Sequence, residues 1–293
     1  MKKLHSVGRL LPMMAAFFIL VPNLSFAADT ADTMAMEHAR YILAYQKPSS
    51  VRMIVTLNEV PLDFINSTED GVSSSGSFNV GQWILPGKNH FRIRMTKNKK
   101  ATLSDWSEAS LILYATTTED PTEGEKAVDY QWSVEKGDKL PVSVSKSFEV
   151  KDAPPSDFWP KAKPITLTQE GKKAVLDLMR SVIDAFSKKD YERGIILTEY
   201  GTNEIFRTTY STPMPREKIV NLYKSIFEGS DMTFRPIDSN KLIFRFIAKR
   251  RILLVTYRDG TAAIKAESKD GKNSVGINVL VAPVDGKWTF VRN

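Results

Sequence analysis

The amino-acid sequence predicts an α+β protein, with an antiparallel β-sandwich in the N-terminal half and three helices with a curved antiparallel sheet in the C-terminal half. Three observations lead to this fold class. Apolar and polar residues alternate between residues 51 and 150, apolar residues recur at three- and four-residue steps after residue 166, and alternation returns after residue 231. These spacings are typical of strands and of helices respectively. We therefore expect a sandwich domain at 46–150, a linker at 151–165 and an α+β domain at 166–293.

The first 27 residues have the three-part pattern of a cleavable secretory signal. Lys2, Lys3 and Arg9 precede an apolar run at Leu10–Val21, and small residues lead up to Ala27. This order of basic, apolar and small residues is what the export machinery recognises. The apolar run is shorter than the ~20 residues that a membrane-spanning helix needs. We expect cleavage near Ala27 and a periplasmic or secreted protein.

The composition excludes several kinds of chemistry. The chain contains no cysteine, so disulfides, thiol catalysis and thiolate metal sites are excluded, and so is a lipid anchor attached to cysteine at the cleavage point. Cleavage of the signal would remove three cations and lower the formal net charge from +7 to +4. Nucleic-acid binding requires a concentrated basic stripe. We therefore expect no nucleic-acid partner, and no other segment is long and apolar enough to span a membrane.

The N-terminal half is expected to consist of short strands separated by turns. Residues 29–45 are either a frayed terminus or a short helix. Further on, His90, Arg92 and Arg94 alternate with apolar residues, which predicts a solvated strand face. Several short strands separated by turn-rich segments favour an antiparallel sandwich. The expected strands are 51–57, 90–95, 111–116, 128–135 and 142–150.

Four prolines mark the segment between the two halves. Pro154, Pro155, Pro160 and Pro164 exclude a helix interior and a central strand. The pair Phe158-Trp159 lies among them, and large aromatic side chains are usually buried. We expect this pair to dock the linker onto one domain.

Three amphipathic helices are expected after the linker. The first covers the apolar face at Ala174–Phe186 and begins with a capping box formed by Thr166 and Gln169. The second is Asp190–Phe206, with an inner face expected at Ile195, Ile196, Tyr200 and Phe206. The third is Arg216–Glu228. The strands expected to follow, with Asp-Gly turns between several of them, are 232–237, 241–249, 251–258, 262–267, 275–284 and 287–291.

The C-terminal half resembles the nuclear-transport-factor-like (cone-fold) superfamily. The run Ala185–Asp190 (AFSKKD) is similar to the end of the first helix of that superfamily, and Val284–Val291 (VDGKWTFV) is similar to its last hairpin. The resemblance covers about residues 166–293 and implies a curved sheet around a cavity. Three consecutive helices depart from the usual order of elements, and a cystatin-like sheet is the alternative.

The N-terminal half is similar to galactose-binding-like jelly rolls. The similarity is carried by Asn58–Pro61 (NEVP) and by Trp83–Asn89 (WILPGKN). Immunoglobulin-like sandwiches use similar hairpins and are the alternative.

Histidines and carboxylates are the candidate catalytic groups of this chain. His38 and His90 have no spacing that brings them together, so we expect two surface histidines and no metal site or cofactor. Cone-fold enzymes place an acid or base inside the cavity, and the resemblance implies this role for Asp184 with Tyr191 or Tyr200 beside it. A helix-surface acid is the alternative for Asp184.

Two binding regions are candidates in the C-terminal half. Aromatic residues on the third helix and on the following strands either line an apolar ligand pocket or fill the core. Basic residues around one hairpin either bind an anionic partner or keep the hairpin tip soluble. The candidate pocket residues are Tyr223, Phe227, Phe244, Phe246 and Tyr257. The candidate basic patch consists of Arg245, Lys249, Arg250, Arg251 and Arg258.

Two functional hypotheses follow. The favoured one is a non-catalytic binding or interaction protein of the periplasm. Its partner would be a protein, a glycan or a small apolar molecule, and the C-terminal sheet would allow a homodimer. The alternative is a small cavity enzyme of the isomerase, cyclase or hydratase type that uses Asp184 with a nearby tyrosine.

Overall fold

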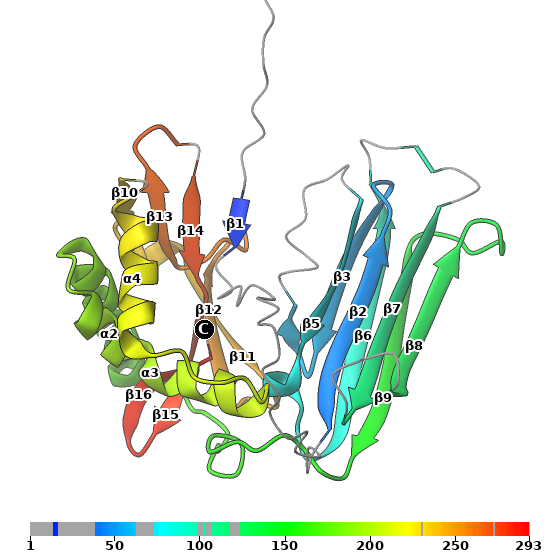
Figure 1. The fold of residues 1–293 in the computed structure, drawn as a ribbon, viewed down its shortest axis with the longest axis horizontal. Helices are drawn as coiled ribbons and strands as arrows, with labels where there is room; N and C mark the ends of the chain where they lie inside the picture. The colour runs from blue at the N-terminus through cyan, green and yellow to red at the C-terminus, as the bar shows by residue number, and fades with distance from the viewer. Residues whose placement is uncertain are drawn as a thin grey trace, which may run out of the picture.

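The computed structural model describes residues 14–16, 39–62, 73–98, 102–103, 107–117, 124–229, 231–271 and 273–292. The fold is α+β, with a β-rich N-terminal part and a C-terminal part of helices and sheet (Figure 1). Within the expected signal, the structure describes only strand β1 (Met14–Ala16), which pairs in parallel with β14 (Ser274–Ile277). The expected cleavage site at Ala27 and His38 lie outside the described residues.

The N-terminal half is a sandwich of two four-stranded sheets, as the alternation predicts. One sheet has the order β5-β2-β7-β8 and the other β4-β3-β6-β9, and every neighbouring pair is antiparallel. Their inward residues, among them Leu43, Val55, Ile93 and Leu113, are fully buried. The strands are β2 (Arg40–Lys47), β3 (Val51–Leu57), β4 (Val60–Pro61), β5 (Ser74–Asn79), β6 (Gly87–Lys97), β7 (Glu108–Thr116), β8 (Glu125–Ser133) and β9 (Val142–Val150).

Strand β2 differs from the sequence-based expectation for 29–45. Within the described part of that segment the chain forms a strand from Arg40 onward, and neither a helix nor a frayed end. Tyr41, Leu43 and Tyr45 point into the sandwich, while β2 pairs with β5 on one side and with β7 on the other. Two strand neighbours and a buried face override a weak helical pattern, because tertiary packing contributes more than local propensity.

Two buried asparagines join the hairpins of the second sheet. Asn58 Nδ2 donates to the carbonyl of Trp83 and to Asn89 Oδ1, both at 2.7 Å. Asn89 Oδ1 also accepts from Leu85 N at 2.8 Å, and Asn89 Nδ2 donates to Leu85 O and Gly87 O. The two motifs that carry the N-terminal resemblance are therefore in direct contact.

The three expected helices are formed. They are α2 (Gln169–Ser187), α3 (Tyr191–Thr208) and α4 (Arg216–Phe227). The expected capping box at Thr166 is wrong, because α2 begins later and Thr168 is the N-cap, where its side chain accepts from Gly171 N.

The inner face of α3 was only partly predicted. Ile195 and Phe206 are buried, but Ile196 is 57% exposed. The face of α3 toward the sheet includes glycines instead. A Cβ atom at Gly201 would lie 3.1 Å from backbone atoms of β16 (Lys287–Arg292). Glycine thus lets α3 approach the strand closely, and hydrophobic periodicity does not record such an approach.

The C-terminal strands form two four-stranded sheets. Their orders are β11-β12-β15-β16 and β1-β14-β13-β10. Only Asn278 separates β14 from β15, so the chain bends there and passes from one sheet to the other. An isolated antiparallel bridge between Thr256 and Ala262 closes the turn after β12. The remaining strands are β10 (Met232–Phe234), β11 (Leu242–Ile247), β12 (Ile252–Tyr257), β13 (Ile264–Ser268) and β15 (Val279–Val284), and the short 3-10 helices are η1 (Gly81–Trp83) and η3 (Ser239–Lys241).

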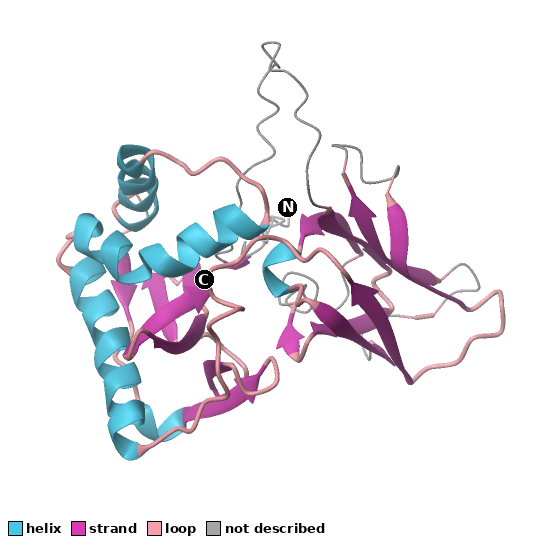
Figure 2. Ribbon diagram, turned by 90° about the horizontal axis from the view of Figure 1, so that it is seen from below, coloured by secondary structure: helices cyan, strands magenta, loops and turns pink. Residues whose placement is uncertain are grey.

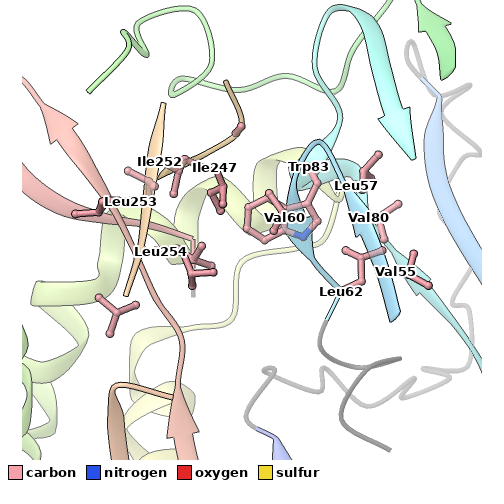
Figure 3. Packing of buried hydrophobic residues seen from close by; sticks show 14 of the residues in the cluster. Val55, Leu57, Val60, Leu62, Val80, Trp83, Ile247, Ile252, Leu253 and Leu254 are labelled. Carbon is pink, nitrogen blue, oxygen red and sulfur yellow. The ribbon is translucent and has the colours of Figure 1, made fainter. Parts of the chain in front are cut away.

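The two halves share one continuous apolar core. Helix α3 extends toward the sandwich and ends beside η1 (Figures 1 and 2). Val60 and Trp83 of the sandwich lie opposite Ile247 and Leu254 of the α+β domain (Figure 3), and all four belong to a single buried cluster. The linker is docked, as the Phe158-Trp159 pair predicts, since both side chains are buried.

Candidate functional site

Asp184, the acid expected in a cavity, lies on the surface of α2. Its side chain is 41% exposed, and its carboxylate forms ion pairs with Lys188 at 2.8 Å and with Arg193 at 3.5 Å. The hydrogen bond from Lys188 holds its pKa below the usual range. Asp184 therefore has the geometry of a solvated helix acid.

The two tyrosines expected beside Asp184 lie in other environments. Tyr191 packs against Phe186 and donates to Glu228 Oε1 at 3.1 Å, and burial together with this carboxylate raises its pKa to about 12. Tyr200 lies further along α3, where it lines a cavity together with the end of the linker. No contact among the described residues joins Asp184 to either hydroxyl.

The aromatic residues proposed for an apolar pocket are divided between separate sites. Tyr223 and Phe227 pack on Phe186 with ring centroids 4.9 and 5.1 Å away, in a filled aromatic cluster. Phe244 instead lies under the ammonium group of Lys172, at 5.1 Å. The rest of the set is also apart, with Phe246 under Arg250 and Tyr257 beside the backbone of Asp238.

The basic hairpin contributes to the contact between the domains. Arg250 stacks over Phe246 at 4.1 Å and donates to the carbonyl of Ile165 at 3.2 Å. The backbone of Lys249 donates to Glu59 Oε2 at 3.1 Å, so this hairpin tip meets the β3–β4 tip. Arg245 and Arg258 remain exposed on β11 and just beyond β12, and Arg251 is half-buried.

A buried ion pair near the C-terminus was not predicted. Arg292 is completely buried and Glu204 is 2% exposed, with Arg292 Nη1 3.1 Å from Glu204 Oε2. Arg292 Nε donates to the carbonyl of Gln82 in the sandwich at 3.2 Å. Glu204 also accepts from Ser156 Oγ and from Asp157 N of the linker. Sandwich, linker and α+β domain therefore meet at this pair.

A second unpredicted feature is a row of basic side chains on the sandwich. The outward residues of β6 are Lys88, His90, Arg92 and Arg94, and all four are exposed. Arg52 of β3 extends the row on the neighbouring strand, opposite Thr96. We call these five residues the basic face. Alternate residues of a strand lie about 6.6 Å apart on one side, so the four basic side chains of β6 extend over about 20 Å.

The residues that surround the basic face are suited to binding an anionic ligand. On the other neighbouring strand, β9, the residues opposite Arg94, Arg92 and His90 are the exposed Ser143, Ser145 and Ser147. Ser147 Oγ lies 3.0 Å from His90 Nδ1. Among the described outward residues of β3, β6 and β9, the only acid is Glu149, opposite Lys88.

The arginines of the basic face have no ionic partner within the described part of the chain. None of Arg52, Arg92 and Arg94 forms an ion pair there, whereas Arg180, Arg193 and Arg235 on the α+β domain all do. The sequence pattern contained this feature, since His90, Arg92 and Arg94 alternate visibly. Alternation alone predicts only a solvated strand face, because the contribution of β9 and β3 depends on strand pairing.

Comparison with known proteins gives no relative: no family model, no curated protein and no solved structure matches this chain. Over the residues that the structure describes, no three His, Asp or Glu side chains are grouped so as to hold a metal ion. Within the same residues, no helix combines the length and apolarity needed to cross a membrane.

Proposed function

We propose that this chain is an exported, non-catalytic binding protein of the periplasm, and that its sandwich binds a linear acidic glycan through the basic face. The observation that carries the proposal is the row of exposed basic residues along β6, whose arginines form no ion pair with any residue that the structure describes. Regular spacing along one strand is suited to a polymer whose negative charges repeat, and less suited to one small anion.

The composition of the basic face favours a glycan over a protein partner. Stable protein interfaces have buried aromatic or apolar anchor residues at their centre. The outward positions of β6 and β9 are instead cations, serines, Thr96 and one acid. Serine hydroxyls both donate and accept, so they complement sugar hydroxyls, while the arginines bind carboxylate groups in a bidentate manner.

The first prediction concerns charge reversal on β6. We expect the protein to bind polygalacturonate and not neutral dextran of similar length, as measured by isothermal titration calorimetry. The double variant Arg92→Glu/Arg94→Glu should weaken binding at least about tenfold, because two attractive contacts become repulsive. Affinity should also fall steeply between about 0.15 and 1 M salt, where the Debye length shortens from about 8 to about 3 Å.

The matched control is Arg245→Glu/Arg258→Glu on the α+β domain. It changes the net charge by the same amount at two exposed arginines outside the basic face. Binding within about twofold of the unmodified protein is expected, because the contacts are local. Equal weakening by both double variants would show that only net charge matters. Binding of poly-glutamate without binding of polygalacturonate would show that the partner is an acidic polypeptide.

A further inference from the structure

His90 is the only member of the basic face whose kind of side chain titrates near neutral pH. It lies between Lys88 and Arg92 on the outward side of β6, and all three side chains are exposed. Histidine side chains in general titrate between about pH 5 and 8, whereas lysine and arginine stay charged to about pH 10. The number of positive charges along β6 therefore depends on pH at the position of His90.

The hydroxyl of Ser147 allows His90 to gain a proton without losing its hydrogen bond. Ser147 Oγ lies 3.0 Å from His90 Nδ1. A hydroxyl donates to a neutral ring nitrogen and accepts from a protonated one, so Ser147 is a partner for both charge states. The backbone of His90 is also held, because its N–H donates to Asn58 Oδ1 and its carbonyl accepts from Asn58 N.

The second ring nitrogen of His90 is available to a ligand. Among the residues that the structure describes, His90 Nε2 has no hydrogen-bond partner. Both ring nitrogens donate in a protonated histidine, so Nε2 donates outward while Nδ1 donates to Ser147. A hydrogen bond from the protonated ring to a carboxylate is charge-assisted, and it is therefore stronger than one from the neutral ring.

Two cations and two acids surround His90 on the outward side of the sheet. They are Lys88 and Arg92 on β6, Glu149 diagonally across on β9, and Glu59 in the β3–β4 turn. Glu149 lies directly opposite Lys88, and Glu59 Oε2 accepts from the backbone of Lys249. Neighbouring cations disfavour a further positive charge, whereas a bound polyanion favours it. Protonation of His90 and binding of a polyanion should therefore promote each other.

We propose that His90 makes glycan binding at the basic face stronger in mild acid, an inference that rests on the proposed function of this face. In mild acid, the protonated ring completes a row of four cations along β6, and its Nε2 donates to a carboxylate of the glycan. At higher pH, a neutral ring separates Lys88 from Arg92, and binding weakens. Because the two equilibria are linked, glycan binding takes up a proton wherever His90 is partly neutral.

The test compares binding of polygalacturonate to the full chain at about pH 5.5 and about pH 8, by isothermal titration calorimetry at low salt. The carboxylates of the polymer stay ionised at both values, since carboxylic acids titrate near about pH 4. We expect binding to be about two- to fivefold tighter at the lower pH, which is the contribution of one exposed ion pair. Near neutral pH, the heat of binding should vary with the ionisation enthalpy of the buffer, because a proton is taken up.

Two variants assign the effect to His90. His90→Gln removes the titrating group, so its affinity should be the same at the two pH values. His90→Lys carries a permanent charge, so its affinity should also be independent of pH, and at the higher pH it should exceed that of the unmodified protein. The matched control is His5→Gln/His38→Gln, which replaces the other two histidines of the chain, both outside the described residues. This control should keep the full pH dependence.

The possible outcomes distinguish this inference from the proposed function. Equal affinity of the unmodified protein at the two pH values, or a pH dependence that persists in His90→Gln, would overturn the role of His90 and leave the glycan site intact. Absence of polygalacturonate binding at both pH values would overturn the glycan site, and this inference with it.

Discussion

Arg292, at the end of the last strand, is buried at the junction of the two domains, and its Nη2 has no hydrogen-bond partner among the described residues. Its guanidinium carbon lies 5.8, 5.6 and 5.4 Å from the ring centroids of Trp83, Phe158 and Trp159. Burial lowers the pKa of Arg292 to about 10, against the opposing effect of Glu204, so the side chain is still charged at neutral pH. A charged group in such an apolar environment is costly unless it is paired, so the stability of the fold depends on the ion pair between Arg292 and Glu204.

At this residue scale, we expect Arg292→Met to lower the free energy of unfolding by about 3–5 kcal/mol, because Glu204 would lose its buried cation and keep only the longer ion pair with Arg207 at 3.6 Å. Urea unfolding followed by tryptophan fluorescence measures the change. Adding Glu204→Gln should restore part of the loss, since the uncompensated charge is removed. Arg258→Met is the control at an exposed position and should change stability by no more than about 0.5 kcal/mol. A neutral effect of Arg292→Met would mean that the ion pair does not hold the junction.

At the scale of elements, the turns of the sandwich are coupled by side-chain hydrogen bonds. Asn58 and Glu59 have positive φ of 51° and 70°, the conformation that a tight hairpin turn between β3 and β4 requires. Asn58 Oδ1 accepts from His90 N, which ties this turn to the start of β6. The orientation of β6, and with it the basic face, therefore depends on the two asparagines.

Replacement of Asn89, which is fully buried, tests this coupling. Asn89→Ala leaves Leu85 N and one acceptor at Leu85 O without their partner, so we expect a loss of about 3 kcal/mol in the free energy of unfolding. Chemical denaturation measures it, and Asn240→Ala at an exposed position should cost about 0.5 kcal/mol or less. If Asn89→Ala were as stable as the unmodified protein, the asparagine pair would not support the turns.

At the scale of the whole molecule, the two domains form a single unit, because several independent contacts join them. Asn79 Nδ2 donates to the carbonyl of Thr209 at the end of α3, and Ala248 N donates to the carbonyl of Asn58. A Cβ atom added at Gly81 would overlap the carbonyl oxygen of Thr208. These contacts add to the apolar core that the two halves share. A large apolar interface suppresses relative motion of two domains.

We therefore expect Gly81→Ala to separate η1 from α3, because the added methyl group meets backbone that cannot move alone. The linker at 151–165 should become sensitive to limited proteolysis, and thermal unfolding should change from one transition to two. Gly260→Ala is the control. It places alanine at a positive φ of 84° in a hairpin with open space, so it should lower stability and leave the linker protected. Continued protection of the linker in Gly81→Ala would contradict a junction held by this contact.

The predictions that succeeded depend on local patterns. The helix boundaries of α4 and the strands β11 and β12 follow from periodicity and turn residues, because neighbours in sequence determine which side chains share a face. The error at Thr166 has a similar local origin, since Thr168 offers the same cap two residues later. The candidate sites could be predicted less well. Which strands flank β6, and which groups surround Arg292, are decided by contacts between distant segments.

The sequence by itself determined the α+β class, the three helices and most of the strands, the absence of cysteine chemistry and the docking of Phe158-Trp159. Its periodic patterns and composition are sufficient for these. Only the tertiary structure decided that 40–47 is a central strand, that Arg292 meets Gln82 across 210 residues, and that serines of β9 line the cations of β6. The physical reason is that strand pairing and the burial of a charge depend on segments that are far apart in the sequence. A local sequence pattern therefore cannot predict them.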